Sequence, residues 1–124
     1  AATLAVLKRD NVWAKLEDLG AYLEKKMAPI IANASLPVGQ VRVGSVGWFY
    51  LQDGPAPRSA EALDSAAGKR YAPLFRGLLA RGVYVAPSAY EVFFLSSAHT
   101  PAHVDKFAAA FAASLDEAAK ARTA

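Results

Sequence analysis

The sequence feature that most constrains the fold is a stripe of apolar residues in the first third of the chain. Its members recur at spacings of 3, 4, 4 and 3, and they are Leu16, Leu19, Leu23, Met27 and Ile30. Side chains three and four residues apart share one face of an α-helix, so the stripe predicts a long helix with a single buried face. Asp10-Asn11 supplies polar side chains suited to cap its start, and the polar turn at 33–35 ends it.

Residues 1–9 have a helical pattern too, with Leu4 and Leu7 three residues apart. Nothing before them in the sequence can cap or start a helix. We therefore interpret residues 1–9 as the tail of a truncated helix and the chain as a piece of a longer protein.

The residues after Pro37 change from a helical to a β pattern. The segment QVRVGSVGWFYLQ (40–52) is rich in β-formers and contains Gly44 and Gly47, which predicts two short strands or one bulged strand. The Gly- and Pro-rich segment 53–59 predicts a loop.

Helical spacing returns between residues 60 and 80. Pro73 lies within this stretch and predicts either a kink or two helices, with Pro73 in the first turn of the second. Arg81-Gly82 is a typical helix end, because glycine readily adopts the left-handed conformation.

Two further strands are predicted at Val83–Val85 and Val92–Ser97, with a bend at 86–88 between them. Thr100-Pro101 then predicts the start of a last helix, with a hydroxyl cap followed by proline at the first helical position. The apolar face of that helix comprises Val104, Phe107, Phe111 and Leu115.

The predicted element order is therefore α-β-β-α-β-β-α. Helices covering one face of a small, mostly antiparallel sheet make an α+β fold, and 124 residues suffice for a single domain with one core. We expect Trp13 and Trp48 to lie in or at the edge of that core.

Composition excludes several classes of function. The chain has no cysteine, which excludes a disulfide scaffold and fits the reducing cytoplasm, where we expect the protein to be located. No apolar run approaches the roughly 20 residues of a membrane span, so no membrane partner is expected. The net charge is +3, but lysines and arginines are spread along the chain rather than gathered with aromatic residues, so no nucleic-acid partner is expected.

No complete catalytic set or phosphate-binding glycine loop is present. His99 and His103 are i, i+4 neighbours, a spacing that can bridge a metal on one helix face. However, His99 precedes the Thr100 cap, and Asp105 is not placed to complete three ligands. We therefore expect no metal site and interpret the two histidines as polar residues near a helix start.

Glu91 is the exception among the charged residues, because it lies in an apolar, strand-like run. Along a strand it would share a face with Phe93, while Tyr90 and Phe94 point the other way. A carboxylate there is either partly desolvated, which suits acid–base work in a cleft, or exposed at the first residue of the strand. The spacing leaves both alternatives open.

This stretch resembles the C-terminal segment of a known enzyme family. GVYVAPSAYEVFFLSSAHT (82–100), followed by PAHVDKF, is similar to the family pattern G-V-Y-(hydrophobic)-A-P-S-x-(F/Y)-E-A-G-F-(hydrophobic)-S-x-A-H-(T/S). The family is that of the glutamate-1-semialdehyde 2,1-aminomutases, class III aminotransferases of the pyridoxal phosphate (PLP) fold type I. The resemblance covers essentially the whole chain, and its last third carries the specific motif.

The resemblance implies a location for the candidate site. Glu91 would lie at the active-site mouth, near the substrate's amino groups, as a catalytic residue of the rim. Ser88 and Tyr90 would shape the same rim. The chain, residues 1–124, would be the small C-terminal domain that closes over the PLP-binding large domain of a homodimeric enzyme.

The family's lysine that forms the Schiff base with PLP lies upstream of this segment. None of the chain's lysines is in a strand-end setting that would desolvate an amine, so we expect no cofactor bound to this segment alone. The complete enzyme would use PLP to convert glutamate-1-semialdehyde to 5-aminolevulinate in tetrapyrrole biosynthesis. The isolated chain is expected to be inactive.

Two alternatives remain. Val92 and Phe93 replace the Ala-Gly that is usual beside the glutamate, which leaves the substrate open and admits a transaminase with an external amino donor. The ending S-x-A-H-T favours the aminomutase branch. From a different class, the chain would be a free-standing, non-catalytic binding module.

Overall fold

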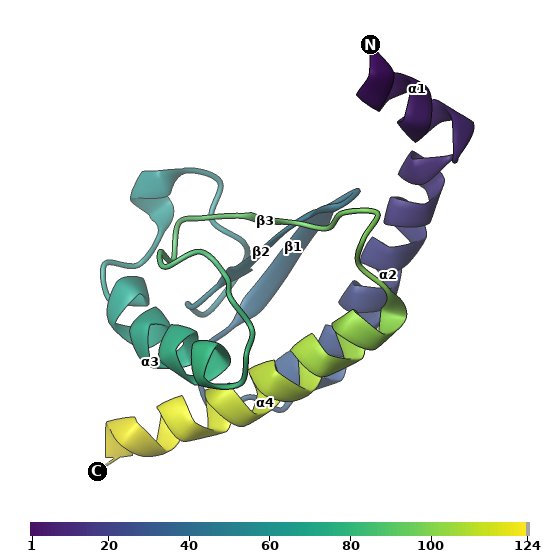
Figure 1. Cartoon of the computed structure of the whole chain (residues 1–124). Coiled ribbons are helices and arrows are strands. Elements are labelled where there is room, and N and C mark those ends of the chain that lie inside the picture. Colours follow the sequence, from purple (N-terminus) through teal and green to yellow (C-terminus); the bar gives the residue numbers. More distant parts are fainter. Residues whose placement is uncertain (124) are drawn as a thin grey trace.

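Four α-helices and a three-stranded sheet form the chain in a computed structural model, which describes residues 1–123 and the side chains of residues 1–121. In order, the elements are α1 (Ala2–Arg9), α2 (Val12–Ala32), β1 (Gly39–Val43), β2 (Val46–Tyr50), the 3₁₀ helix η1 (Ala60–Ala62), α3 (Ala67–Ala80), β3 (Phe93–Phe94) and α4 (Pro101–Thr123). The sheet is antiparallel with strand order β1-β2-β3. α4 packs against both α2 and α3 (Figure 1). The predicted α+β class is confirmed.

Helix α2 carries the predicted apolar stripe. Leu19, Leu23 and Met27 are buried in the main core, and the two outer members of the stripe are half-buried. At the C-terminal end, the Asn33 amide donates a hydrogen bond of 2.8 Å to the Pro29 carbonyl oxygen. The long one-sided helix is therefore confirmed.

The junction of α1 and α2 differs from the prediction. The Asp10 carboxylate accepts hydrogen bonds of 2.7 and 2.9 Å from the Arg9 guanidinium, and Asn11 adopts a left-handed conformation with φ 49°. Neither side chain caps α2, so the predicted cap is wrong; Asn11 instead provides the bend between the helices. α1 buries no residue and projects beyond the rest of the chain (Figure 1).

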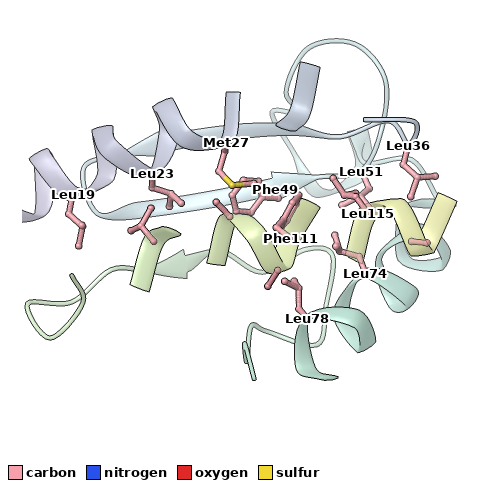
Figure 2. Close-up of a cluster of buried hydrophobic side chains, with 14 residues drawn as sticks. Leu19, Leu23, Met27, Leu36, Phe49, Leu51, Leu74, Leu78, Phe111 and Leu115 are labelled. Carbon is pink, nitrogen blue, oxygen red and sulfur yellow. The ribbon is translucent and has the colours of Figure 1, made fainter. Parts of the chain in front are cut away.

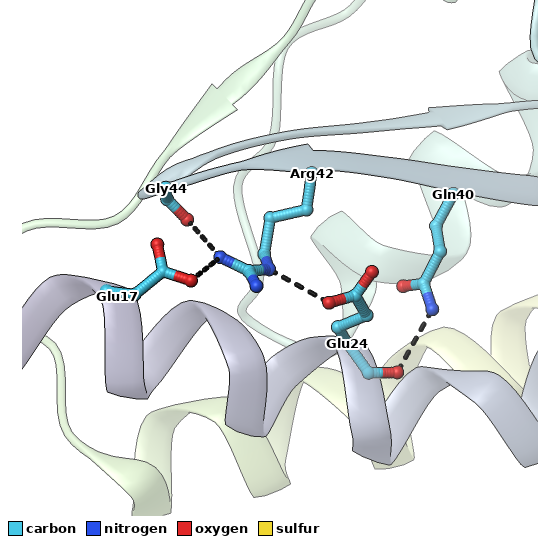
Figure 3. A network of polar contacts seen from close by, with 5 residues as sticks. All are labelled: Glu17, Glu24, Gln40, Arg42 and Gly44. Carbon is cyan, nitrogen blue, oxygen red and sulfur yellow. Dashed lines mark hydrogen bonds and ion pairs between the residues drawn. The ribbon is translucent and has the colours of Figure 1, made fainter.

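Strands β1 and β2 form a hairpin, so the alternative of one bulged strand is wrong. The two-residue turn contains Gly44 at φ 58°, a left-handed conformation that favours glycine. Arg42 on β1 faces α2: its guanidinium donates to Glu17 at 2.9 Å, to Glu24 at 3.0 Å and to the Gly44 carbonyl oxygen at 2.9 Å (Figure 3). These contacts fix β1 against α2.

The sheet face toward α2 and α4, here called the inner face, carries the main core. Phe49 is central: its ring lies 4.7 Å from that of Phe111, 5.3 Å from that of Phe93 and 5.7 Å from that of Phe107. Leu51, directly after β2, and Leu115 on α4 extend the core (Figure 2). The predicted apolar face of α4 is thus confirmed.

The two strands predicted near the motif are largely absent. Val83–Val85 is irregular, and the strand predicted at Val92–Ser97 reduces to Phe93–Phe94. Phe94 pairs with Val46, the first residue of β2. Because the hairpin turn precedes Val46, β2 provides no partner for the residues that follow Phe94. The observed order is α-α-β-β-α-β-α.

Helix α3 is a single helix that begins at Ala67, so the alternative with Pro73 in the first turn of a second helix is wrong. The Asp64 side chain accepts from the Ala66 backbone N–H at 2.9 Å and from the Arg70 guanidinium at 2.6 Å, which secures the start of the helix. These contacts lower the pKa of the Asp64 carboxyl, the backbone N–H having the largest effect.

The predicted start of α4 is confirmed, with Pro101 at its first position. The Thr100 hydroxyl does not cap the backbone as predicted, because it lies 3.2 Å from the His103 Nδ1 atom instead. Across the described residues, no helix is both long enough and apolar enough to span a membrane. The predicted burial of Trp13 is wrong: this side chain on α2 is 54% exposed, whereas Trp48 is half-buried at the edge of a second, smaller cluster.

Candidate functional site

The predicted site residues lie on one irregular segment between α3 and β3, residues 82–92, here called the rim segment. Side chains from other elements hold it. The Tyr71 hydroxyl of α3 donates to the Ala86 carbonyl oxygen at 2.6 Å, and the Trp48 indole N–H of β2 donates to the Ala89 carbonyl oxygen at 2.9 Å. Ala89 is buried. The segment is therefore fixed in position without being part of a helix or strand.

Ser88 organises the turn within the rim segment. Its hydroxyl accepts a hydrogen bond of 3.2 Å from the Tyr90 backbone N–H, and its carbonyl oxygen accepts one of 3.3 Å from the Glu91 backbone N–H. The hydroxyl thus supports the turn that places Tyr90 and Glu91 at the surface, where both are exposed.

Glu91 lies two residues before β3, and its side chain is exposed. Of the two environments that the sequence left open, the structure therefore shows the exposed one. Within the part of the chain that the structure describes, no hydrogen bond or ion pair engages its carboxylate. The backbone at Glu91 is held by the turn while its carboxylate is exposed to solvent.

The cavity that Glu91 borders is too small for a substrate. It holds about 20 Å³, room for about one water molecule. A larger groove of about 620 Å³ lies between the α1–α2 junction and the turn before α4, and Ser88, Tyr90 and Glu91 do not line it. The start of the rim segment, residues 82–85, borders a separate groove of about 330 Å³, which Ser88, Tyr90 and Glu91 do not line either.

Apolar side chains are exposed on the opposite, outer face of the sheet. Val43, Val46 and Phe94 lie side by side across the three strands, and Val41 is the next outward-pointing residue along β1. Val43 is 77% exposed and Phe94 66% exposed. We refer to these four residues as the outer patch. Three apolar side chains in a row across a sheet are typical of a surface that another layer covers.

The outer face is covered at its other end. There Tyr50 packs with Leu63, Ala67 and Ala89 in the second cluster, and the Trp48 ring lies 5.6 Å from that of Tyr50. Sequence reasoning singled out neither this cluster nor the role of Tyr71 in holding the rim. The signal that could have found the cluster is the pair Trp48 and Tyr50, two aromatic residues at alternate positions of β2 that point to the outer face of the sheet.

Val92 and Phe93, the departures from the family pattern, point in different directions. The Phe93 ring faces the core and covers Gly47, where an added Cβ would lie 2.2 Å from the ring. Val92 is exposed beside Glu91. Only Val92 therefore stands where it can alter the rim, while Phe93 fills the core.

Both histidines have structural roles. The His103 Nδ1 atom accepts from the Thr100 backbone N–H at 3.0 Å, and the His99 Nδ1 atom accepts from the Ser96 backbone N–H at 2.9 Å. In the first case the side chain of the third helical residue bonds back to the cap, as glutamate does in a capping box. Among the described residues, no group of three or more His, Asp or Glu side chains is placed to hold a metal.

The described residues do not fit a PLP site. All seven lysines are exposed on helices, and Lys26 pairs with Asp105 at 2.9 Å. A lysine that forms a Schiff base needs a desolvated amine beside the cofactor, and none of these meets that requirement. We therefore derive no catalytic step through the cofactor from this chain.

Comparison with known proteins agrees with the fold and the motif. No family model matches the chain. Two curated relatives are glutamate-1-semialdehyde 2,1-aminomutases: that of Thermus thermophilus, 39% identical over 85% of this chain and 25% of its own length, and that of Opitutus terrae, 35% identical over 94% of this chain and 27% of its own length.

Two solved structures share the fold. An omega-transaminase from Sphaerobacter thermophilus aligns with a TM-score of 0.71 over 86% of this chain and 24% of its own, at 22% identity. A beta-phenylalanine aminotransferase from Variovorax paradoxus aligns with a TM-score of 0.72 over 83% of this chain and 23% of its own, at 25% identity. The chain thus spans about a quarter of the length of the proteins it matches. It is homologous to the C-terminal quarter of the glutamate-1-semialdehyde 2,1-aminomutases and class III aminotransferases.

Proposed function

We propose that the chain is the small C-terminal domain of a PLP-dependent enzyme of the glutamate-1-semialdehyde 2,1-aminomutase type. In the proposed reaction, amino and carbonyl groups exchange between adjacent carbons of the substrate to give 5-aminolevulinate. The domain forms one wall of the active site and is inactive alone. The large domain supplies the cofactor-binding residues, and the complete enzyme is a homodimer.

The observation that carries this proposal is that the exposed Glu91 precedes the uncovered outer patch by three residues in the sequence. Glu91 follows a turn fixed by Ser88, and three residues later Phe94 begins the outer patch. An exposed apolar patch with a free carboxylate nearby is typical of a surface that closes against another domain around a small ligand. The homology to the C-terminal quarter of larger enzymes supports the same conclusion.

Electrostatic attraction gives Glu91 a role where the proposed two domains meet. A carboxylate attracts the ammonium groups of amino substrates and products, and the attraction strengthens once a second wall excludes water. Tyr90 is exposed next to it and shapes the same rim, while Ser88 holds the turn. In this proposal Glu91 contacts the substrate's amino groups.

The test uses the complete gene product. We expect it to show the visible absorbance of bound PLP and to convert glutamate-1-semialdehyde to 5-aminolevulinate, whereas the 124-residue chain does neither. Glu91→Gln should lower kcat/KM about tenfold, of the order lost with one charge-assisted contact, while leaving the PLP absorbance unchanged. Asp116→Asn, at an exposed position on α4, is the matched control.

Absence of PLP binding and of conversion in the complete protein would overturn the proposal. An unchanged kcat/KM in Glu91→Gln would remove Glu91 from the rim. Net amino transfer to a 2-oxo acid, without internal exchange, would establish the transaminase alternative. That alternative is favoured by Val92, the one departure from the family pattern that is exposed at the rim.

A further inference from the structure

We infer that Trp48 and Tyr71 are positioning residues for Glu91: they hold the rim segment so that its carboxylate reaches the substrate. This inference rests on the proposed function and names two residues outside the motif. Both donate to backbone carbonyl oxygens of the rim segment, Tyr71 to Ala86 and Trp48 to Ala89. The two contacts flank Ser88.

The rim segment depends on these two hydrogen bonds because it has no regular backbone hydrogen bonding of its own. Between the end of α3 and Phe93 it contains no helix or strand. Its internal bonds at Ser88 are 3.2 and 3.3 Å long, whereas the bonds from Tyr71 and Trp48 are 2.6 and 2.9 Å long. The shorter bonds tie the segment to the body of the domain.

Both donors are themselves well anchored. Tyr71 packs against the main core and the second cluster, and Trp48 packs against the second cluster. Burial raises the pKa of Tyr71 to about 12, so its hydroxyl remains protonated and able to donate across the neutral range. The carbonyl oxygens that they satisfy would otherwise be left without a partner in a partly buried position.

The connection to Glu91 is short. Glu91 lies two residues after Ala89 and two residues before β3, so its backbone is fixed at both sides while its side chain is free. Loss of either donor frees the turn without changing the carboxylate. The expected consequence is a displaced Glu91 in an otherwise folded domain.

The first test is hydrogen exchange on the 124-residue chain. Trp48→Phe and Tyr71→Phe remove one donor each and keep a ring. We expect exchange of the Tyr90 and Glu91 amides to accelerate about fivefold, of the order for one lost hydrogen bond, with the amides of α4 unchanged. The controls are Trp13→Phe, at an exposed position on α2, and Tyr22→Phe, whose hydroxyl donates to Asp105 and not to the rim segment.

The second test is a double-mutant cycle in the complete protein. If Trp48 acts through Glu91, Trp48→Phe should lower kcat/KM about threefold to tenfold in the wild-type background and have no effect when Glu91→Gln is present. A merely structural role would give the same loss in both backgrounds. Tyr71→Phe should behave likewise.

The two tests separate the inference from the proposed function. Unchanged amide exchange in both variants would overturn the inference whatever the enzyme does, and so would additive losses in the cycle. A complete protein without aminomutase or transaminase activity would overturn the proposed function, while faster exchange in the two variants would still establish that Trp48 and Tyr71 hold the Glu91 segment.

Discussion

The two faces of the sheet differ in how far this chain completes them. The inner face is covered by α2 and α4, and Phe49 lies at the centre of a cluster of four phenylalanine rings. The outer face is covered only at the Tyr50 end, and at the opposite end Val43 and Phe94 remain exposed.

This difference indicates where the molecule is self-sufficient and where it depends on another layer. The inner face contains what the domain needs to fold, since burial of apolar area is the main stabilising contribution. The outer patch adds little to folding in this chain. We attribute it to contact with the large domain of the proposed complete enzyme.

The largest expected effect on stability comes from a comparison in which one phenylalanine is truncated on each face of the sheet. Phe111→Ala removes a fully buried ring and should lower the free energy of unfolding by about 3–5 kcal/mol. Phe94→Ala should lower it by less than about 0.5 kcal/mol, because the ring is exposed. Urea denaturation of the 124-residue chain measures both. Equal losses would mean that the outer patch is part of the folding core.

An added methyl group tests the packing of the inner face more finely. In Gly47→Ala the new Cβ would overlap the Phe93 ring, so the ring must move, and we expect a loss of about 1–3 kcal/mol. Gly68→Ala is the matched control, since its Cβ meets nothing within 4 Å and the change should stabilise α3 by about 0.4–1 kcal/mol. Thermal denaturation compares the two. A Gly47→Ala variant as stable as the wild type would show a loosely packed inner face.

The cap of α4 tests how the helix that covers the inner face begins. His103→Ala leaves the Thr100 backbone N–H without its acceptor and should cost about 1 kcal/mol, whereas His103→Gln can bond back to the cap and should retain most of the stability. Chemical denaturation with circular dichroism measures this. Identical losses in the two variants would contradict the capping role.

The smallest effect at neutral pH, and a growing one in alkali, is expected from the ionisation of Tyr71, whose ring packs against the clusters on both faces. Burial raises its pKa from 10.0 to about 12, so the folded chain holds this proton more tightly than the unfolded chain. The resulting stability is complete below pH 10 and is lost as the pH rises through about 12.

The measurement is the free energy of unfolding of the wild type and of Tyr71→Phe at several pH values between 10 and about 12. The wild type should lose stability more steeply with rising pH than the variant. Parallel curves would show that Tyr71 titrates as an exposed tyrosine.

Sequence patterns predicted the regular parts of this fold because their periods are local. The stripe of α2 and the Thr100-Pro101 start of α4 depend on neighbouring residues, and both are confirmed. The strands near the motif were over-predicted because Val83–Val85 and Val92–Ser97 have β-formers, whereas pairing depends on a partner strand. After Phe94 that partner runs out, because Phe94 pairs with Val46, the first residue of β2.

The candidate site was accessible from sequence only through its motif. The motif indicated Ser88, Tyr90 and Glu91 together, and the structure places them on one turn. Trp48 and Tyr71 are 41 and 15 residues from the carbonyl groups that they hold, and no local pattern encodes such contacts. The exposure of Trp13 likewise depends on which side of α2 the sheet covers.

The central claim is that the outer patch faces another domain of the complete protein, and thiol accessibility tests it most directly. Phe94→Cys introduces a single thiol into a chain without cysteine, and Leu115→Cys gives a buried reference. Alkylation at position 94, followed by peptide mass mapping, should be fast in the 124-residue chain. In the complete protein it should be slower by about 100-fold, near the rate of the Leu115→Cys reference. Equal rates at position 94 in the chain and in the complete protein would contradict the account.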